Sequence, residues 1–423
     1  MTKRLLKTFI LFICLTIVMP MISAFADTTA PDIIGESAIT MDLDTGEIIY
    51  SKNADVKRSP ASTTKLLTAL IFAENKTKSD MIPYTDYSAS LLETSLAGFV
   101  SGTTSAAKAG DTLSADDVMK AVMIYSANDA AVMMAESVSG SIAAFADKMN
   151  EKAKELGAVN SHFVNPNGLE ESNNVHNTTT AYDLALISKA AYENQWVRDT
   201  MAMSKASVNL NGLRIDFDNR NKILDQNGNV GGKTGTETLA GHCFVGFYNR
   251  NGRNLVTVVL GSEYGATGMN VFNDTKAIAD YSYTATKVPF KSANEEVAQT
   301  ELSYKLFGFF GPTKTITAPV ILNQDVEYYK NDYNDATANI QFVNSDESAW
   351  KVAKNNEVGL TFTVGNHTET VQGTIKIKTG DLIKANLPIY LATILVVIIV
   401  LILIFLLVKL INKSKRRRNR YYR

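Results

Sequence analysis

The sequence predicts an α+β fold, followed by a small all-β domain and a membrane-spanning helix near the C-terminus. Three observations predict this order. Alternating β-rich segments at residues 38–50 and 241–260 enclose a series of apolar helical segments, which favours one antiparallel sheet packed against helices. Short β-type runs separated by polar turns occupy residues 315–377. An apolar run without a formal charge follows at residues 387–408.

The elements of the first part follow from apolar periodicity, capping residues and turn signals. Asp44-Thr45-Gly46 lies between two β-rich runs and indicates a hairpin. Ser59 followed by Pro60 is typical of a helix start, because proline's missing N–H costs nothing in the first turn. Ser114 marks a second helix start, with aspartates in its first turn. The later elements are expected in this order: helices at 130–138 and 142–156, a loop at 163–177, a helix at 180–192, a polar turn-rich segment at 212–229, strands at 241–248 and 253–260, and a helix at 275–286.

Length and charge bound the class of protein. The chain has 423 residues, more than one domain usually contains, and its net charge of −1 gives no indication of a nucleic-acid surface. We expect a catalytic domain at residues 27–290 and an all-β domain at 291–383. The second domain carries no cluster of reactive side chains, and we interpret it as a stalk or platform.

The N-terminus is typical of a cleaved secretory signal at residues 1–26. Basic residues open the chain, an apolar run covers residues 8–22, and Ala24-Phe25-Ala26 forms a small-residue cleavage site. An uncleaved membrane anchor is the competing interpretation. Cleavage removes Cys14 and leaves Cys243 alone, so the exported chain cannot form an internal disulfide, which favours a bacterial envelope over a disulfide-stapled secreted domain.

The apolar run at residues 387–408 predicts a transmembrane helix. At ~1.5 Å per residue it crosses the ~30 Å hydrocarbon core of a bilayer. A basic tail follows at residues 409–423. Because basic flanks stay on the cytoplasmic side, we expect a single-pass protein of the bacterial cell membrane with its catalytic domain outside the cytoplasm.

A candidate nucleophile and its base lie at the start of the first apolar helix. Lys65 follows Ser62 by three residues, so both side chains share one helical face. In apolar surroundings desolvation lowers a lysine pKa from about 10.4 toward neutrality. A neutral amine beside a hydroxyl is an activated nucleophile.

Two further short motifs follow in a fixed order. Ser126-Ala127-Asn128 lies between two predicted helices, where a tight loop presents a hydroxyl and an amide together. Lys233-Thr234-Gly235 opens a strand of a predicted hairpin. Each pattern also occurs elsewhere, and the predicted structural context distinguishes the candidate site from these copies. Ser-x-x-Lys recurs at Ser105–Lys108 and Ser348–Lys351, Ser-x-Asn at Ser207–Asn209 and Ser292–Asn294, and Lys-Thr-Gly at Lys378–Gly380.

The ordered set of three motifs resembles the low-molecular-mass penicillin-binding proteins, which are serine-type D-alanyl-D-alanine carboxypeptidases. The resemblance covers roughly residues 32–290 and includes the segments at 126–130, 165–169, 180–184 and 233–243. It implies a penicillin-binding, β-lactamase-like fold for this part. It also implies a peptidoglycan stem peptide as substrate and β-lactam antibiotics as ligands.

The resemblance further implies the roles of the site residues. Ser62 would attack the carbonyl between two terminal D-alanines, with Lys65 as base. Ser126 would relay a proton to the leaving amine, and Asn128 would bind the substrate peptide. The remaining substrate-binding residues implied are Lys233, Thr234, Gly235 and Thr236, with the backbone N–H groups of Ser62 and Thr236 forming the oxyanion hole.

The sequence departs from the family pattern at one point. The family often carries an arginine after the Lys-Thr-Gly hairpin that binds the terminal carboxylate, and no arginine lies between Arg253 and residue 291. The choice between carboxypeptidase and endopeptidase therefore stays open.

Two further functions are compatible with the motifs: a β-lactamase, for which Glu170 and Glu171 lie in a suitable loop, and a non-enzymatic β-lactam sensor or wall anchor. The scattered histidines show no metal-binding spacing, so neither a metal nor a cofactor is expected.

Overall fold

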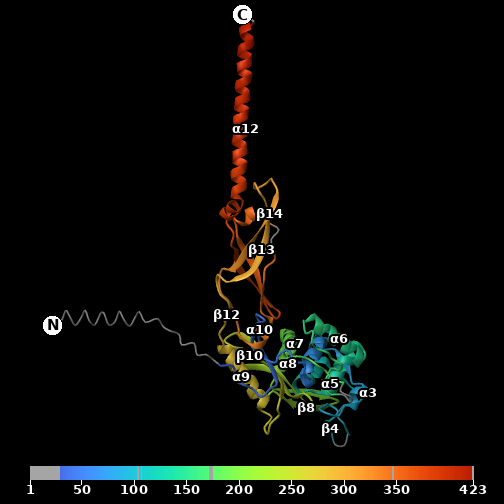
Figure 1. The fold of residues 1–423 in the computed structure, drawn as a ribbon. Helices are drawn as coiled ribbons and strands as arrows, with labels where there is room; N and C mark the ends of the chain where they lie inside the picture. Colours follow the sequence, from blue (N-terminus) through green and yellow to red (C-terminus); the bar gives the residue numbers. More distant parts are fainter. Residues whose placement is uncertain (1–28, 102–103, 106, 171–174, 345–346, 422–423) are drawn as a thin grey trace, which may run out of the picture.

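The computed structural model describes residues 29–101, 104–105, 107–170, 175–344 and 347–421. The predicted signal at residues 1–26 lies outside the described residues. The chain forms a broad α+β body, a slender β domain beside it, and a long terminal helix that extends away from both (Figure 1).

The centre of the α+β body is a five-stranded antiparallel sheet with the strand order β2-β1-β11-β10-β9. The sequence prediction of one antiparallel sheet built from both ends of this region is thereby confirmed. β9 lies at the edge of the sheet, so one side of its backbone is open for pairing. The strands are β1 Ser37–Asp42, β2 Ile48–Lys52, β9 Asn229–Glu237, β10 Gly241–Arg250 and β11 Arg253–Ser262.

Helices cover both faces of this sheet. Successive strand residues point to opposite faces, so neighbouring residues of β11 pack against different helices. Val258 of β11 packs into a core shared with α2 (Lys65–Asn75) and α7 (Ala181–Glu193). The next residue, Val259, packs on the other face with Phe272 of α9 (Asn270–Thr284). The other larger helices are α5 Asn128–Ser139, α6 Ile142–Glu155 and α8 Gln195–Met201.

Short elements surround the helical face. Residues 212–229, predicted as a polar turn-rich segment, contain a strand that pairs with the segment before them, so that prediction missed a hairpin. The short elements are β3 Met81–Pro83, α3 Asp86–Ser90, β4 Val100–Ser101, β5 Thr104–Ser105, β6 Thr112–Ser114, α4 Ala115–Lys120, β7 Lys205–Leu210 and β8 Leu213–Asp218.

The second unit has its own apolar core inside a five-stranded antiparallel sheet with the order β13-β14-β18-β17-β16. The predicted β character of this region is confirmed, although β13 was not predicted. Its elements are β12 Val288–Lys291, β13 Glu296–Lys305, β14 Thr313–Leu322, β15 Val326–Tyr328, α10 Asp332–Thr337, β16 Asn339–Gln341, α11 Ala349–Val352, β17 Glu357–Val364 and β18 His367–Ile375.

Polar and aromatic contacts join the β domain to the α+β body. The ring of Tyr333 stacks on Tyr182 of α7 with centroids 4.6 Å apart. The backbone N–H of Asn366 donates to the Tyr182 hydroxyl at 3.0 Å, and the amide of Asn334 donates to the carbonyl of Ile48 at 2.7 Å. These contacts hold the two units in a fixed relation.

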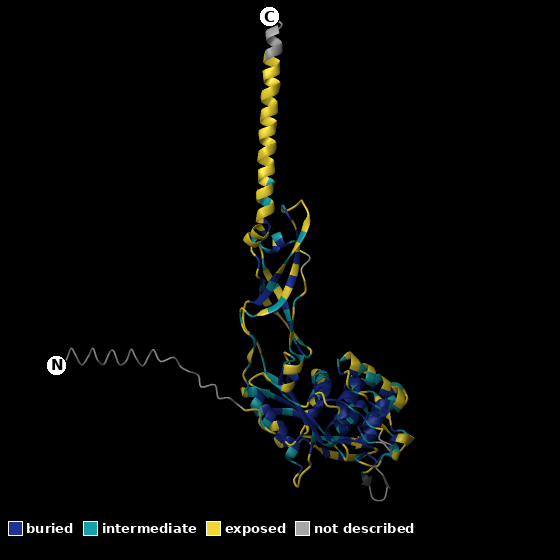
Figure 2. Cartoon of the chain, viewed as in Figure 1, coloured by how far each residue is buried: buried dark blue, intermediate teal, exposed yellow. Residues whose placement is uncertain are grey.

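The terminal helix α12 runs from Thr379 to Tyr421. Its first turns pack on the β domain, where Leu382 and Asn386 are buried. Its large apolar side chains from Leu391 to Ile411 are exposed (Figure 2). By length and composition this helix is able to cross a membrane, as predicted from residues 387–408.

Candidate active site

Ser62 lies in a tight turn rather than in the first turn of an α-helix. Residues Ala61–Thr64 form a 3-10 helix, η1, and α2 begins only at Lys65. Ala61 has a φ of +47°, a left-handed conformation that costs energy in a residue with a Cβ. The predicted start at Pro60 with Ser59 as cap is therefore wrong. Instead, the carbonyl of Pro60 accepts hydrogen bonds from the backbone N–H and hydroxyl of Thr63.

The Lys65 amine is fully buried and contacts the Ser62 hydroxyl. Its Nζ lies 2.7 Å from Ser62 Oγ, 2.8 Å from Asn128 Oδ1 and 2.6 Å from the carbonyl oxygen of Asn167. All three contacts are to neutral acceptors, and no carboxylate is among them. Burial therefore dominates and lowers the pKa of Lys65 to about 7. Close to neutral pH a large fraction of this amine is unprotonated and able to accept a proton.

Ser126 is presented by an irregular helix end. Residues Ala121–Tyr125 form a π-helix, η2, and Ser126 closes it in a left-handed conformation with φ 70°. π-Helical turns are rare and often mark functional sites. The hydroxyl of Ser126 accepts a hydrogen bond of 2.8 Å from Lys233 Nζ, which reaches it from β9. Burial and the nearby Lys65 charge lower the pKa of Lys233 well below its ordinary value.

Asn128 connects the Ser62–Lys65 pair to a loop at the cleft wall. Its Oδ1 accepts from Lys65, and its Nδ2 donates to the carbonyl of Glu93 at 2.9 Å. Its backbone N–H donates to the carbonyl of Thr94 at 2.8 Å. The orientation of the Asn128 amide is thus fixed from both ends, because each end has a partner of the correct kind.

The strand β9 passes directly behind the nucleophile. A Cβ on Gly235 would lie 2.9 Å from the backbone nitrogen of Ser62 and 3.0 Å from that of Thr63. Only glycine permits this approach. Thr234 and Thr236 flank this point on the open edge of the sheet.

These segments enclose a narrow cleft with a volume of about 70 Å³. The structure brings the predicted residues of all three motifs to this one place, with the two lysines beneath its floor. Of the copied patterns, Ser348–Lys351 lies at α11 of the β domain and Lys378–Gly380 at the base of α12. The cleft is lined by Ser62, Glu93, Thr94, Ser126, Asn128, Arg220, Thr234, Gly235, Thr236 and Glu237.

Arg220 is a site residue that the sequence did not indicate. It lies in the connection between β8 and β9, and its guanidinium stacks over the ring of Tyr125 at 4.9 Å. Its positive charge contributes to the lowered pKa of both Lys65 and Lys233. The arginine at the cleft thus precedes β9 rather than following the Lys233 hairpin. No local sequence pattern marks it as a site residue.

Two carboxylates also line the cleft. Glu237 ends β9 and is half-buried, and Glu93 lies on the wall loop. Burial, reinforced by Glu93 and Glu170, raises the pKa of Glu237 to about 7. Protonation of the cleft thus changes near neutral pH at both Lys65 and Glu237.

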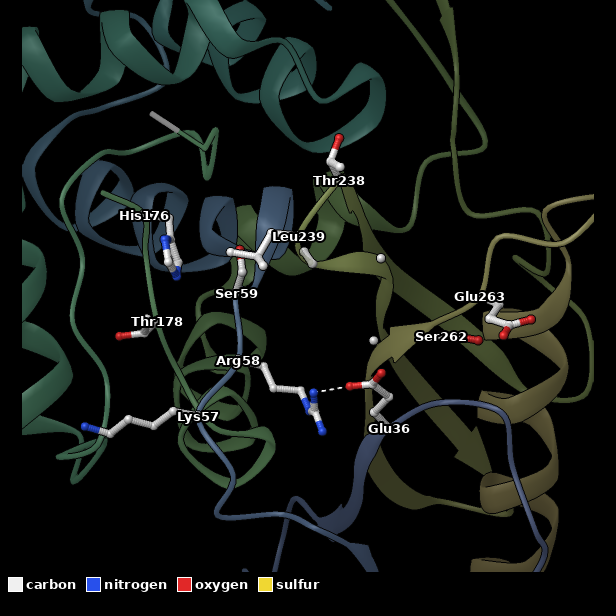
Figure 3. Close-up of a pocket in the computed structure, with 13 residues that line it drawn as sticks. Glu36, Lys57, Arg58, Ser59, His176, Thr178, Thr238, Leu239, Ser262 and Glu263 are labelled. Carbon is white, nitrogen blue, oxygen red and sulfur yellow. Dashed lines mark hydrogen bonds and ion pairs between the residues drawn. The ribbon is translucent and has the colours of Figure 1, made fainter. Parts of the chain in front are cut away.

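A larger hollow of about 410 Å³ lies beyond the β9–β10 turn and shares no lining residue with the cleft (Figure 3). Arg58 and Glu36 form an ion pair on its floor, and His176 faces it from the long loop (Figure 3). Ser262 on its lining donates its hydroxyl to Asp274 Oδ2 at 2.9 Å, but this hydroxyl is buried and the Asp274 carboxylate also accepts from the backbone N–H groups of Ile34 and Gly35. We therefore assign the chemistry to the smaller cleft, because the Ser62–Lys65 pair lies there.

The fold and the site together define a serine acyl-transfer enzyme of the penicillin-binding class. Residues 24–264 match the family model described as D-alanyl-D-alanine carboxypeptidase. The chain belongs to this family of serine-type peptidases.

Relatives and solved structures agree with this assignment. The chain is 29% identical to the D-alanyl-D-alanine carboxypeptidase DacF of Bacillus subtilis, over 71% of this chain and 76% of that protein. It is 32% identical to the D-alanyl-D-alanine endopeptidase of Escherichia coli, over 66% and 86%. It is similar to ampicillin-bound penicillin-binding protein D2 of Listeria monocytogenes, with a TM-score of 0.52, 27% identity, and coverage of 60% of this chain and 100% of that one.

Proposed function

We propose that this protein removes the terminal D-alanine from peptidoglycan stem peptides through an acyl-enzyme on Ser62. The observation that carries this proposal is the 2.7 Å contact between Lys65 Nζ and Ser62 Oγ, made by a buried amine whose pKa is lowered to about 7. An unprotonated amine at this distance is a general base for the hydroxyl.

Acylation begins when Ser62 Oγ attacks the carbonyl carbon of the penultimate D-alanine. The hydroxyl proton passes to the neutral amine of Lys65, and the carbonyl oxygen becomes an oxyanion. The backbone N–H groups of Ser62 and Thr236, both at the cleft, are the donors proposed for that oxyanion. Losing one such donor costs about 3 kcal/mol of transition-state stabilisation.

The C–N bond then breaks, and the departing amine of the terminal D-alanine needs a proton. Ser126, at the same cleft, is placed to relay to it the proton that Lys65 took from Ser62, which leaves Lys65 neutral again. The hydrogen bond that Lys233 donates at 2.8 Å orients the Ser126 hydroxyl. Water next attacks the Ser62 ester with Lys65 again as base, which releases the shortened peptide and restores the serine.

The open edge of β9 is the proposed docking strand for the substrate. An extended peptide pairs with such an edge through backbone hydrogen bonds. Thr234 and Thr236 lie along it, and Arg220 supplies a fixed positive charge at the cleft. We assign recognition of the terminal carboxylate to Arg220, which favours substrates whose leaving residue carries a free carboxylate, as in a carboxypeptidase.

Penicillin binding follows from the same chemistry, because a β-lactam acylates a serine nucleophile without releasing a fragment that opens the site. A β-lactamase needs a carboxylate that activates water for rapid deacylation. Glu171 lies outside the described residues, and Glu170 is engaged elsewhere, because its Oε1 accepts from the backbone N–H groups of Leu239 at 2.8 Å and Ala240 at 3.1 Å.

The proposed setting is the outer face of a bacterial cell membrane. Helix α12 is the anchor, its basic end is cytoplasmic, and the β domain is a spacer between the bilayer and the cleft. This arrangement is supported by the exposed apolar surface of α12 and by the contacts between the β domain and the α+β body.

Release of D-alanine from a synthetic stem pentapeptide tests the proposed function. The intact protein should release one D-alanine per peptide, and Ser62→Ala should abolish release while leaving the fold unchanged. Ser348→Ala, in a copied pattern of the β domain where the hydroxyl makes no capping hydrogen bond, is the matched control and should keep full activity. Undiminished release by Ser62→Ala would refute the assignment.

A further inference from the structure

The β13–β14 hairpin ends in an exposed aromatic tip. The turn from Leu306 to Pro312 reads Leu-Phe-Gly-Phe-Phe-Gly-Pro. Phe309 is 89% exposed and Phe310 is 54% exposed, whereas Leu306 beneath them is buried. Such exposed aromatic groups on an extracytoplasmic domain indicate a partner rather than a core.

The tip is an ordered structure that holds its aromatic side chains outward. The rings of Phe307 and Phe310 stack at 5.0 Å, and Phe309 contacts Phe310 at the same distance. The backbone N–H of Phe307 donates to the carbonyl of Phe310 at 3.1 Å, which closes the turn. Ordering these rings before binding lowers the entropic cost of inserting them into another phase.

The tip is attached to α12 at the point where the apolar run begins. The hydroxyl of Tyr390 donates to the carbonyl of Leu306 at 2.6 Å. The ring of Phe307 lies 5.7 Å from the Tyr390 ring. One helical turn earlier, Asn386 donates to Tyr304 of β13 at 2.7 Å. The hairpin and the base of the helix are therefore one packed unit, and Figure 1 shows the hairpin reaching alongside the start of α12.

This attachment fixes the depth of the tip relative to a bilayer. The run at residues 387–408 crosses a ~30 Å hydrocarbon core with little excess length at ~1.5 Å per residue. Tyr390 therefore lies at the boundary between headgroups and acyl chains, the level where tyrosine is enriched. Because Leu306 and Phe307 contact Tyr390, the tip lies at that level as well.

We infer that the tip of the β13–β14 hairpin inserts Phe309 and Phe310 into the membrane interface beside α12, on the side that carries the catalytic domain. The partner is the lipid surface itself. The protein then contacts the bilayer at two points, and the second contact restricts tilting of the β domain about the base of α12. The inference rests on the proposed membrane anchoring by α12.

An environment-sensitive fluorophore tests this insertion in the full chain reconstituted into phosphatidylcholine–phosphatidylglycerol vesicles. An NBD label is attached to Phe309→Cys, a position whose exposure allows substitution without disturbing the core. Cys243 is fully buried, and the unsubstituted chain measures any background labelling. Val159→Cys, on an exposed loop of the catalytic domain, is the matched control, and Leu401→Cys reports the span.

The label at residue 309 should be shielded from iodide and quenched by lipids that carry a nitroxide about 5–10 Å below the headgroups. The label at residue 159 should show neither effect, and the label at residue 401 should be quenched at the bilayer centre. If iodide quenches the label at residue 309 while lipid nitroxides quench the label at residue 401, the insertion is wrong but the anchor stands. If iodide quenches both labels, the anchor and the insertion are both wrong. Shielding at 309 without lipid quenching indicates a protein partner and also overturns the insertion. None of these outcomes depends on D-alanine release.

Discussion

Gly235 of β9 lies directly behind the backbone nitrogen of Ser62, so closely that a Cβ at residue 235 would lie 2.9 Å from that nitrogen. β9, the proposed docking strand, and the η1 turn that carries Ser62 are therefore in close backbone contact. This contact keeps the two proposed oxyanion donors, on Ser62 and Thr236, in a fixed relation.

Gly235→Ala should lower kcat/KM for D-alanine release by about 10²–10³, the scale of losing one oxyanion donor. The added methyl group must displace either the η1 turn or β9, and a donor moves with it. Steady-state kinetics on a pentapeptide measure this loss. Gly359→Ala, in a strand of the β domain where the new Cβ meets its nearest neighbour at 3.5 Å, should retain activity. Equal activity of the two variants would contradict the prediction.

The pH dependence of kcat/KM should report Lys65. Burial lowers the pKa of Lys65 to about 7, and only the unprotonated amine accepts the Ser62 proton. The rate should therefore be constant above this pKa and fall about tenfold for each pH unit below it. Measuring kcat/KM against pH in buffers of constant ionic strength checks this fall on the acid side. A rate that stays level down to pH 5 would show that neutral Lys65 is not the base.

Arg220→Gln should both lower kcat/KM and shift the pH dependence of kcat/KM. Losing the guanidinium should lower kcat/KM by about 10–100-fold, because a charge-assisted hydrogen bond to a carboxylate contributes roughly 1.5–3 kcal/mol. The acid limb should move to higher pH, since the Arg220 charge lowers the pKa of Lys65.

A substrate with an amidated C-terminus separates the two effects of Arg220. It lacks the carboxylate, so it should be used poorly by the unsubstituted protein and lose little further in Arg220→Gln. Arg214→Gln, an exposed arginine paired with Asp216 in the same hairpin region, is the matched control and should change neither quantity. If Arg220→Gln and the unsubstituted protein show the same ratio of kcat/KM between the carboxylate and the amide substrate, Arg220 does not bind the terminal carboxylate.

Tyr333→Ala should loosen the β domain without disabling the cleft. The Tyr333 ring is buried and stacks on Tyr182 at 4.6 Å, so its removal should lower the free energy of unfolding by about 3 kcal/mol. Thermal unfolding in detergent measures the loss, and D-alanine release at a permissive temperature should persist. The exposed Tyr87→Ala should have little effect. Equal unfolding temperatures for both variants would show that this stack does not stabilise the junction.

Much of the architecture was predictable, because apolar periodicity and turn residues act locally. The hairpin around Asp44 and the helices at residues 130–138 and 142–156 are found close to their predicted ranges. The alternating strand at Leu213–Asp218 was hidden by a polar composition, although Ile215 and Phe217 both point into the core. The period-2 alternation of these residues is the local signal for this strand.

The site was predictable as a set of motifs but not in its detailed geometry. The three motifs indicated a common cleft, and the structure brings them together. The 3-10 turn at Ser62 and the π-helix before Ser126 were not predictable, because contacts with distant segments impose them. The close fit of Gly235 against Ser62 and the hydrogen bond from Lys233 to Ser126 join residues more than a hundred positions apart. Arg220 was missed for the same reason, since no local pattern brings it to the cleft.

Mass spectrometry of the intact protein after exposure to penicillin, followed by peptide mapping, tests the central claim most directly. We expect a stable adduct of one penicillin per chain, carried by the peptide that contains Ser62 and absent from Ser62→Ala. An adduct on a different serine, or an adduct of equal yield in Ser62→Ala, would contradict the proposed acyl-enzyme.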